Sequence, residues 1–351
     1  MEDLVSNLAG YAGRRVLITG HTGFKGSWLS LWLVQLCAKV IGFSDTVPTD
    51  PSHFTLLDLD IDDRRGTICD GAAIDAVIAE TNPDIVFHFA AQALVRQAYA
   101  DPLTTYRTNV IGTLAVLEAA RRHGVGAMVV ATTDKVYRND ESGRRYVETD
   151  ELGGADPYSA SKSCVELMIQ SYRKTIDPDG AMAIASVRAG NVIGGGDWAE
   201  DRLIPDLVRA AFGGATAVIR NPDSTRPWQH VLDVLARYLL IGARLLDGDR
   251  TVADAWNLGP VSEASIRVGD IVDAVREQVP ELSAQIHPDS GGHPESGLLQ
   301  LDSSKALTRL GWRPRWEGVM LDRTIGWYRA LHEGGRTISA EQLAEYQAVP
   351  A

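Results

Sequence analysis

Cysteine is scarce in this chain of 351 residues, which has only Cys37, Cys69 and Cys164. Three cysteines so far apart do not build a disulfide framework, and their spacing does not match a zinc site. We therefore predict free thiols that fill the core, a reducing cytoplasmic environment and no bound metal.

Long apolar runs and an excess of basic residues are missing as well. The sequence has no apolar run of about 18 residues, so no membrane span is expected. The N-terminal MEDLVSNLAG lacks the basic region that opens a signal peptide. The net charge of −12 argues against a nucleic-acid partner, because such proteins need a basic face. A small anionic ligand stays compatible with this charge, since a few arginines and a helix N-terminus can hold a diphosphate.

Apolar runs rich in valine and isoleucine alternate with stretches of helical periodicity. This alternation predicts an α/β fold, a doubly wound (Rossmann) parallel sheet covered by helices on both faces. Beyond about residue 195 the alternation loosens. We therefore predict a first domain over 1–190 and a smaller, irregular C-terminal lobe over 191–351, with chain returns to the first domain. The predicted strands are 14–19, 38–43, 84–91, 127–133 and 183–188, and the predicted helices are 24–37, one that contains 75–80, 103–122 and one that starts at 157.

A glycine-rich turn joins the first predicted strand to the first predicted helix. Gly20 permits the tight turn, Gly23 lets a pyrophosphate approach the backbone, and Gly26 lets the helix pack closely on the sheet. A glycine turn without a ligand is the alternative. Because a strand precedes the turn and a helix follows it, we expect residues 1–190 to bind a dinucleotide.

Two charged residues bear on the choice of dinucleotide. Asp45, just past the second strand, stands where an acid would bind the adenosine ribose of NAD, unless it is an ordinary loop acid. Lys25 could instead attract the 2′-phosphate of NADP. We favour NAD, with NADP as the alternative. Trp28 and Trp32, one helical turn apart, are predicted to lie in the core.

Tyr158 and Lys162 are four residues apart on a predicted helix, so their side chains share one face. A lysine cation and a positively charged nicotinamide both favour phenolate. We therefore expect a lowered pKa for Tyr158, which would make it a base for a hydroxyl group. An exposed pair without a role is the alternative.

The strand at 127–133 ends in Thr133, followed by Asp134 and Lys135. Ligands of open α/β sheets bind beyond the carboxyl ends of the strands. A simple hydride-transfer enzyme needs only a hydroxyl at this place, whereas an acid and a lysine add proton-transfer capacity. The alternative is a charged pair at a strand end, exposed to water.

With these motifs, the sequence resembles the extended short-chain dehydrogenases and, within them, the CDP-glucose 4,6-dehydratases. The resemblance runs from about residue 14 to about 316, and Lys135, where glutamate is more usual, is similar to the CDP-glucose branch. It implies an NAD-dependent lyase that oxidises C4 of CDP-glucose, eliminates water across C5–C6 and returns the hydride to C6. The matching stretches are VLITGHTGFKGSWLSLWL (16–33), IVFHFAAQALVRQAY (85–99), TNVIGTLAVLEA (108–119), TTDKVY (132–137), DPYSASK (156–162), VRAGNVIGGGDWAEDRLIPD (187–206), RPWQHV (226–231) and WNLGP (256–260).

The resemblance also implies a role for each catalytic residue. Thr133 would hydrogen-bond the sugar 4-hydroxyl, Tyr158 would take its proton, and Lys162 would hold the nicotinamide ribose and tune Tyr158. Asp134 would protonate the departing 6-hydroxyl, and Lys135 would remove the C5 proton.

Further residues match positions that bind the cofactor in this family. Thr67 stands where the family often has an acid that binds adenine. Tight packing of Ala90 and Ala91 and helix capping by Asn109 are the alternatives. The cofactor-binding candidates are Gly20, Gly23, Phe24, Gly26, Asp45, Thr67, Ile68, Ala90, Ala91, Asn109, Tyr158 and Lys162.

The substrate-binding candidates match positions that hold the nucleotide diphosphate or base. Arg226 is the strongest of them because a guanidinium can grip a diphosphate with two hydrogen bonds, although a surface arginine is the alternative. Asn191 and Asn257 are also candidates, with a turn-forming role as the alternative. Weaker candidates, each with a structural alternative, are Arg96, Arg202, Trp228 and His230.

Rival functions remain open. The same fold serves epimerases and reductases, and a dehydratase could act on a different nucleotide-linked hexose. A non-catalytic nucleotide-binding regulator is the rival from another class. Asp134 and Lys135 argue against the epimerase or reductase, and the presence of Thr133, Tyr158 and Lys162 argues against the regulator.

We also predict a homodimer. The helix 103–122 and the helix from 157 offer an outer face to a second copy. Cys164, Leu167 and Met168 could form an apolar stripe on that face, and burial inside the monomer is the alternative.

Overall fold

A seven-stranded parallel sheet forms the centre of the protein in the computed structural model, which describes residues 4–176, 181–261, 266–286, 299–311 and 313–350. Its strands are β1 (Arg15–Thr19), β2 (Lys39–Ser44), β3 (Asp62–Arg65), β4 (Ile85–His88), β5 (Ala127–Ala131), β7 (Ala183–Ala189) and β12 (Ala255–Leu258). They lie in the order β3-β2-β1-β4-β5-β7-β12, so the direction of winding reverses between β1 and β4. Ligands of open sheets bind beyond the carboxyl ends of the strands at such a reversal.

The inner strands are buried on both faces, which explains why they occur in the sequence as unbroken apolar runs. Every residue of β4, β5 and β7 is buried. The edge strand β3 consists of two aspartates and two arginines and pairs only with β2, so no apolar pattern predicted it. The predicted doubly wound α/β fold is confirmed.

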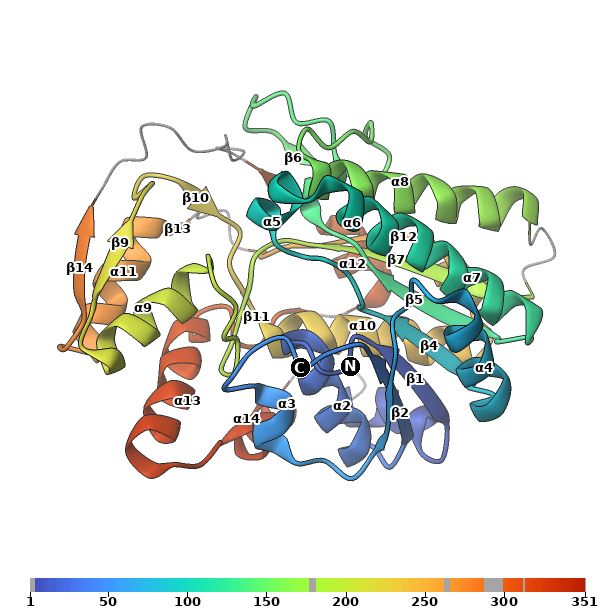
Figure 1. Ribbon diagram of the computed structural model, residues 1–351, viewed down its shortest axis with the longest axis horizontal. Coiled ribbons are helices and arrows are strands. Elements are labelled where there is room, and N and C mark those ends of the chain that lie inside the picture. Colours follow the sequence, from blue (N-terminus) through green and yellow to red (C-terminus); the bar gives the residue numbers. More distant parts are fainter. Residues whose placement is uncertain (1–3, 177–180, 262–265, 287–298, 312, 351) are drawn as a thin grey trace.

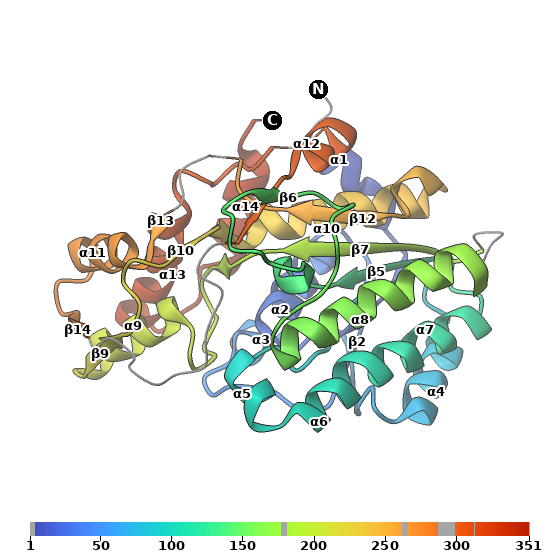
Figure 2. The ribbon, with the colours of Figure 1, turned by 90° about the horizontal axis from the view of Figure 1, so that it is seen from above.

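Helices cover both faces of the sheet (Figures 1 and 2). On one face α4 (Gly71–Thr81), α7 (Thr113–Arg122) and α8 (Pro157–Ser171) bury an apolar cluster against the strands. On the other face α2 (Phe24–Gln35) and α10 (Val231–Leu246) belong to a second, larger cluster. The helix predicted over 103–122 is a continuous run of α6 (Pro102–Tyr106), the π-helical η2 (Arg107–Gly112) and α7.

Two predictions about core residues have different outcomes. Trp28 and Trp32 are fully buried in the larger cluster, as predicted. The prediction that the cysteines fill the core is wrong, because Cys37 and Cys164 are exposed and Cys69 is half-buried. Cys37 lies in the turn after α2 and Cys69 in the loop after β3, where no strand or helix directs a side chain inward. Cys164 lies on the outer side of α8.

The smaller lobe lies beyond one end of the sheet, at the left of Figure 1. It contains α9 (Leu203–Gly213), β9 (Thr216–Ile219), α11 (Val268–Gln278) and β14 (Ser283–Ile286), with β9 and β14 parallel. Between these segments the chain returns to the sheet, where α10 packs and β12 pairs with β7. The other elements are α1 (Leu4–Leu8), η1 (Ala9–Tyr11), α3 (His53–Leu57), α5 (Val95–Ala100), η3 (Asp134–Val136), β6 (Arg145–Tyr146), η4 (Tyr172–Ile176), β8 (Val192–Ile193), β10 (Thr225–Arg226), β11 (Gln229–His230), η5 (Arg250–Val252), β13 (Ile266–Arg267), β15 (Gln300–Leu301), α12 (Ser304–Leu310), α13 (Met320–Gly334) and α14 (Ser339–Ala348).

Candidate active site

A cavity of about 370 Å³ lies between the carboxyl ends of the central strands and the smaller lobe. Thr132 and Gly190, which directly follow β5 and β7, line it from one side, and the start of α9 lines it from the other. Although the whole chain carries a net charge of −12, seven basic residues and only three acidic ones line the cavity, which suits an anionic ligand. The charged lining residues are Lys25, Arg96, Lys135, Lys162, Arg202, Arg220 and Arg226, with Asp134, Asp197 and Asp201.

The glycine turn has the geometry of a phosphate-binding turn. Gly20 has a φ of 78°, and a Cβ on it would collide with the backbone nitrogen of Ala90. A Cβ on Gly26 would collide with the carbonyl oxygen of Gly20, so α2 packs directly on the turn. A Cβ on Gly23 would meet only that same oxygen, at 3.4 Å, so packing inside the protein does not require glycine there. Among the described residues no side chain caps the first turn of α2, and its amides suit a pyrophosphate.

Asp45 and Thr67 lie at the same edge of the sheet, because they follow the neighbouring strands β2 and β3. Both residues are exposed, whereas Ile68 is buried. The Asp45 carboxylate accepts a hydrogen bond from the Thr46 N–H at 2.7 Å and stays at the surface. An exposed carboxylate therefore follows β2, next to β1, which leads into the glycine turn.

The remaining cofactor candidates divide into two groups. Phe24 and Ala91 line the cavity. Asn109 is fully buried outside the cavity lining, where its Nδ2 donates to the Ser161 hydroxyl at 2.9 Å and to the Gln92 carbonyl at 3.0 Å. Its Oδ1 accepts the Gln92 N–H at 2.9 Å. Asn109 thus ties α8 to the loop after β4 and does not cap a helix.

Lys25 lies in the cavity and not at the adenosine edge. It shares the cavity lining with Asp134 and Arg202, and its Nζ is 6.0 Å from the centroid of the Phe89 ring. Burial first and the charge of Arg202 next lower the pKa of Lys25 to about 8. Lys25 therefore shares a cavity with Asp134 and Arg202, whereas Asp45 is exposed just after β2 and does not line that cavity, which favours NAD over the alternative in which Lys25 attracts a 2′-phosphate.

The start of α8 positions Tyr158 and Lys162. Asp156 caps the helix by accepting the Ser159 N–H at 3.0 Å, and Pro157 occupies the first turn, where its fixed φ suits a helix. Tyr158 and Lys162 then line the cavity from successive turns. The Lys162 Nζ donates to the carbonyl of Ala131, at the end of β5, at 3.1 Å.

Burial governs the protonation of this pair. Burial raises the pKa of Tyr158 to about 12, and neighbouring Thr133 and Arg202 oppose it only in part. Burial and then the charge of Lys25 lower the pKa of Lys162 to about 7. The predicted lowering of the Tyr158 pKa by Lys162 is therefore wrong for the chain by itself, since a lysine with this pKa carries only part of a positive charge at neutral pH. A further cation beside the phenol is needed to favour phenolate.

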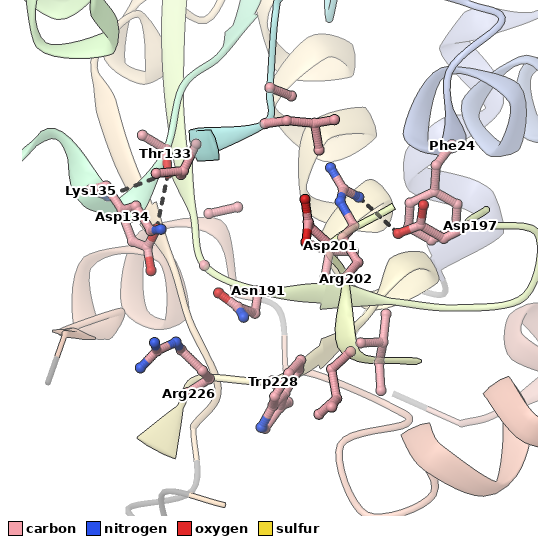
Figure 3. A pocket seen from close by; sticks show the side chains of 18 of the residues that line it. Phe24, Thr133, Asp134, Lys135, Asn191, Asp197, Asp201, Arg202, Arg226 and Trp228 are labelled. Atoms are coloured by element: carbon pink, nitrogen blue, oxygen red, sulfur yellow. Dashed lines mark hydrogen bonds and ion pairs between the residues drawn. The ribbon is translucent and has the colours of Figure 1, made fainter. Parts of the chain in front are cut away.

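The segment after β5 brings a hydroxyl, an acid and an amine together (Figure 3). The Thr133 hydroxyl donates to Asp134 Oδ1 at 3.0 Å and accepts the Lys135 N–H at 3.3 Å. Asp134 is only 4% exposed, and burial raises its pKa, although the Lys135 charge opposes the rise. Burial thus moves this carboxyl towards the protonated form, the form from which a general acid donates.

The smaller lobe contributes polar groups to the same cavity. Asn191, Arg226 and Trp228 line it near the segment after β5, as Figure 3 shows. After burial and Lys135, the charge of Arg226 also acts on the pKa of Asp134, which places the guanidinium within electrostatic reach of that carboxyl.

Arg202 and Arg96 reach the cavity paired with acids. Arg202 donates to Asp197 Oδ2 at 2.8 Å, and Arg96 lies 3.4 Å from Asp201 Oδ1. The two acids belong to the GGGDWAEDR stretch. The sequence analysis matched that stretch as a whole but did not assign them individually. Arg220 and Phe89 also line the cavity, and no motif in the sequence distinguished them.

Two of the substrate-binding candidates, Asn257 and His230, lie outside the cavity. Asn257 is fully buried; its Oδ1 accepts the Tyr137 hydroxyl at 2.6 Å, and its Nδ2 donates to the Tyr146 carbonyl at 2.7 Å. The structure therefore does not place Asn257 against the substrate, because its position on β12 directs the amide into the fold. His230 is also fully buried and caps α10 by accepting the Leu232 N–H at 3.2 Å.

Comparison with known proteins agrees with this geometry. The family model described as GDP-mannose 4,6 dehydratase matches residues 17–322. The chain belongs to this dehydratase family. One similar protein is the CDP-glucose 4,6-dehydratase of Salmonella typhimurium. It is 43% identical over 349 residues, which cover 96% of this chain and 97% of the relative.

Solved structures share the fold of this dehydratase-family chain. The epimerase Mth375 of Methanothermobacter thermautotrophicus matches with a TM-score of 0.83 and 24% identity, covering 94% of this chain and 96% of the epimerase, a likeness of fold alone. DesIV, a dTDP-glucose 4,6-dehydratase of Streptomyces venezuelae solved with NAD bound, matches with a TM-score of 0.76 and 25% identity, covering 91% and 98%.

Neither a metal site nor a membrane span is found among the described residues. There, no three His, Cys, Asp or Glu side chains are grouped so that they could hold a metal ion. No helix in that part of the chain combines the length and the apolar character that crossing a membrane requires.

Proposed function

We propose that this member of the dehydratase family is an NAD-dependent nucleotide-sugar 4,6-dehydratase, a hydro-lyase, with CDP-glucose as its substrate. The observation that carries the proposal is that Asp134 and Lys135 line the same cavity as Tyr158 and Lys162. Oxidation of a hydroxyl needs only the tyrosine and lysine. Elimination of water needs an acid and a base in addition, and Asp134 and Lys135 supply both.

The cofactor is held along the carboxyl edge of the sheet. The first-turn amides of α2 hold its pyrophosphate, Asp45 binds the adenosine ribose, and residues 67–68 flank the adenine. Phe24, Ala91 and Lys162 line the cavity, where Lys162 would hold the nicotinamide ribose. When bound, the nicotinamide accepts a hydride from C4 and later returns it to C6. The NAD present in the DesIV structure supports the same cofactor here.

The first step is oxidation at C4. Thr133 hydrogen-bonds the 4-hydroxyl and Tyr158 takes its proton. Burial raises the pKa of Tyr158, and Thr133 and Arg202 lower it. When bound, oxidised NAD would supply the additional positive charge that favours the phenolate required for this step.

The second step is the loss of water across C5–C6. The 4-keto group makes the C5 proton acidic, and Lys135 removes that proton. Asp134, whose pKa burial raises, donates its own proton to the 6-hydroxyl, which leaves as water. A hydride added at C6 and a proton returned to C5 by Lys135 complete the 4-keto-6-deoxy sugar.

Two observations support CDP-glucose as the substrate. The relative from Salmonella typhimurium, 43% identical, is a CDP-glucose 4,6-dehydratase. In this chain Arg226 and Asn191 face the catalytic segment across the cavity, where a guanidinium can grip a diphosphate with two hydrogen bonds. Arg202 and Arg96 add positive charge to the same wall.

Incubation of the purified protein with a panel of nucleotide-linked hexoses tests this function. The expected product of CDP-glucose is lighter than the substrate by one water and carries a 4-keto group. An isomer of unchanged mass would support an epimerase instead. Dehydration of another nucleotide-linked hexose in preference to CDP-glucose would keep the reaction and overturn the substrate.

We also propose that the enzyme is a cytoplasmic homodimer. Leu103, Ile111 and Leu167 are 78%, 56% and 56% exposed, and they lie on the adjacent elements α6, η2 and α8. Exposed apolar side chains gathered on one helical face are typical of a protein interface. Cys164 is exposed on the same helix as Leu167, and its free thiol agrees with a reducing cytoplasm.

The two parts of the chain divide the binding work in this proposal. Residues 1–190 bind NAD, and residues 191–351 mainly bind the nucleotide sugar, with α10 and β12 as the returns to the sheet. The cavity lining supports this division, because Tyr158 and Lys162 come from the first part and Arg202 and Arg226 from the second.

A further inference from the structure

A third residue shares the catalytic face of α8. Tyr158, Lys162 and Glu166 follow one another at intervals of four, so they lie along one side of the helix. Glu166 is fully buried and does not line the cavity. Its Oε2 lies 2.7 Å from Nη2 of Arg188 on β7, and both side chains are 0% exposed. Burying two charges is costly unless each gains further hydrogen bonds, so the other contacts of this pair matter.

Glu166 also holds the start of the catalytic segment. Its Oε1 accepts the Thr132 hydroxyl at 2.6 Å, and Thr132 directly precedes Thr133. Its Oε2 accepts the Ser186 hydroxyl at 3.0 Å in addition to the guanidinium. Both oxygens of the Glu166 carboxylate therefore accept hydrogen bonds, and these bonds link α8 to β7 and to Thr132, which precedes the catalytic segment 133–136.

Arg188 holds the other end of the same segment. Its Nη1 donates to the Tyr137 hydroxyl at 2.7 Å and to the Glu148 carbonyl at 3.0 Å. The Tyr137 hydroxyl in turn donates to Asn257 Oδ1 at 2.6 Å. Tyr137 follows the one-turn helix η3, so the buried ion pair contacts both residues that flank 133–136.

We propose that Glu166, Arg188 and Tyr137 are positioning residues that hold Asp134 and Lys135 in register with Tyr158 and Lys162. The inference rests on the proposed function, because it assigns the elimination to Asp134 and Lys135.

The two pairs of catalytic residues differ in how rigidly they are held. Tyr158 and Lys162 are fixed by a four-turn helix, whereas Asp134 and Lys135 lie on a single 3₁₀ turn of three residues. A single turn has few hydrogen bonds of its own, so its orientation depends on its neighbours. The Ser163 hydroxyl on α8 donates to the Val136 carbonyl at 2.9 Å, and the anchors at Thr132 and Tyr137 hold the two ends. Displacing a reacting group by about 1 Å can cost on the order of 100-fold in rate. Loosening the Tyr137 anchor should therefore slow elimination more than oxidation.

The decisive variant is Tyr137→Phe, which removes the hydroxyl between Arg188 and Asn257 but keeps the ring. Removal of Glu166 or Arg188 would leave a buried unpaired charge and could unfold the protein for that reason alone. Tyr146→Phe is the matched control. The Tyr146 ring stacks on that of Tyr137 with centroids 5.1 Å apart, and its hydroxyl contacts the surface residues Asn139 and Asp140 instead of the ion pair.

The measurement is a single turnover of the NAD-loaded enzyme with CDP-glucose, followed by bound NADH absorbance and by product mass. In Tyr137→Phe we expect oxidation close to the wild-type rate and elimination on the order of tenfold slower, because the loosened segment should move its reacting groups by less than the ~1 Å that costs about 100-fold. Reduced cofactor should therefore accumulate, and uptake of deuterium at C5 from heavy water should fall. Tyr146→Phe should partition like the wild type.

Thr132→Val tests the other anchor. It is nearly isosteric and removes the hydroxyl that donates to Glu166. Because the next residue, Thr133, orients the 4-hydroxyl, oxidation should slow together with elimination. Equal slowing of oxidation and elimination in Tyr137→Phe, the same partition in Tyr137→Phe and Tyr146→Phe, or wild-type rates of both steps in Thr132→Val would overturn the proposal. A wild-type enzyme that dehydrates no nucleotide-linked hexose would instead overturn the proposed function, which keeps the two failures distinct.

Discussion

Lys25 and Lys162 extend from helices on opposite faces of the sheet into one cavity, where burial and then the charge of Lys25 lower the pKa of Lys162 to about 7. Burial and then the charge of Arg202 likewise lower the pKa of Lys25 to about 8. Burial of two amines whose pKa values lie so near neutral pH lowers the stability of the fold. It also favours the binding of anions, which would restore the positive charge of the amines.

Lys162→Met should stabilise the folded protein at neutral pH. The pKa of Lys162 falls from 10.5 to about 7 on folding, so the unfolded chain binds more protons between these values. Wild-type stability therefore rises as the pH increases from 7 towards 10.5, and the cost of the buried amine at pH 7 is on the order of 3–5 kcal/mol. Loss of the hydrogen bond to Ala131 offsets about 1 kcal/mol of the gain.

Thermal unfolding of Lys162→Met and wild type at several pH values checks this prediction. The melting temperature of the variant should exceed that of the wild type at pH 7, and the difference should shrink towards pH 10. Lys39→Met, at an exposed lysine, is the control and should change the melting temperature little. A difference that grows with pH would contradict the assignment.

Tyr158→Phe should abolish the first oxidation and leave cofactor binding nearly intact. Proton transfer by a positioned group contributes about 10²–10⁴-fold to a rate, and phenylalanine keeps the ring that lines the cavity. The measurement is the rate of NADH formation on mixing with CDP-glucose, with the bound cofactor quantified in the same sample. Near-normal turnover would show that Tyr158 is not the base.

Lys135→Ala should separate elimination from oxidation. Thr133, Tyr158 and Lys162 remain in place, so C4 oxidation stays feasible, while the C5 proton loses its base. Bound NADH and 4-keto-hexose should accumulate as a slow rise in absorbance, and deuterium uptake at C5 from heavy water should fall. Wild-type exchange at C5, or unchanged product formation, would assign the base to another group.

Leu167→Glu and Ile111→Glu should convert a dimer into monomers. Each change places a charge on the apolar face formed by η2 and α8, where a partner copy would have to bury it at high cost. Val218→Glu is the control, because Val218 is equally exposed, at 56%, but lies on β9 of the smaller lobe. Sedimentation of the wild type and of all three variants measures the oligomeric state. A wild type that is monomeric at every concentration would contradict the proposed dimer.

The sequence by itself determined the features that depend on local periodicity. The runs at β1, β4, β5 and β7 predict buried strands because both faces of a parallel sheet are covered. The four-residue interval between Tyr158 and Lys162 places both side chains on one helical face whatever surrounds them. The polar edge strand β3 escaped prediction because nothing buries its outer side.

Only the tertiary structure decided where long-range neighbours put a side chain and what burial does to its charge. The direction of Lys25 depends on how α2 meets the lobe built by residues more than 170 positions later in the chain. Asn257 and Tyr137 are 120 residues apart, and their hydrogen bond turns a predicted substrate contact into a support for the catalytic segment. Burial, which no local pattern reveals, reverses the expected pKa shift of Tyr158 because desolvation of the phenolate outweighs the nearby charges.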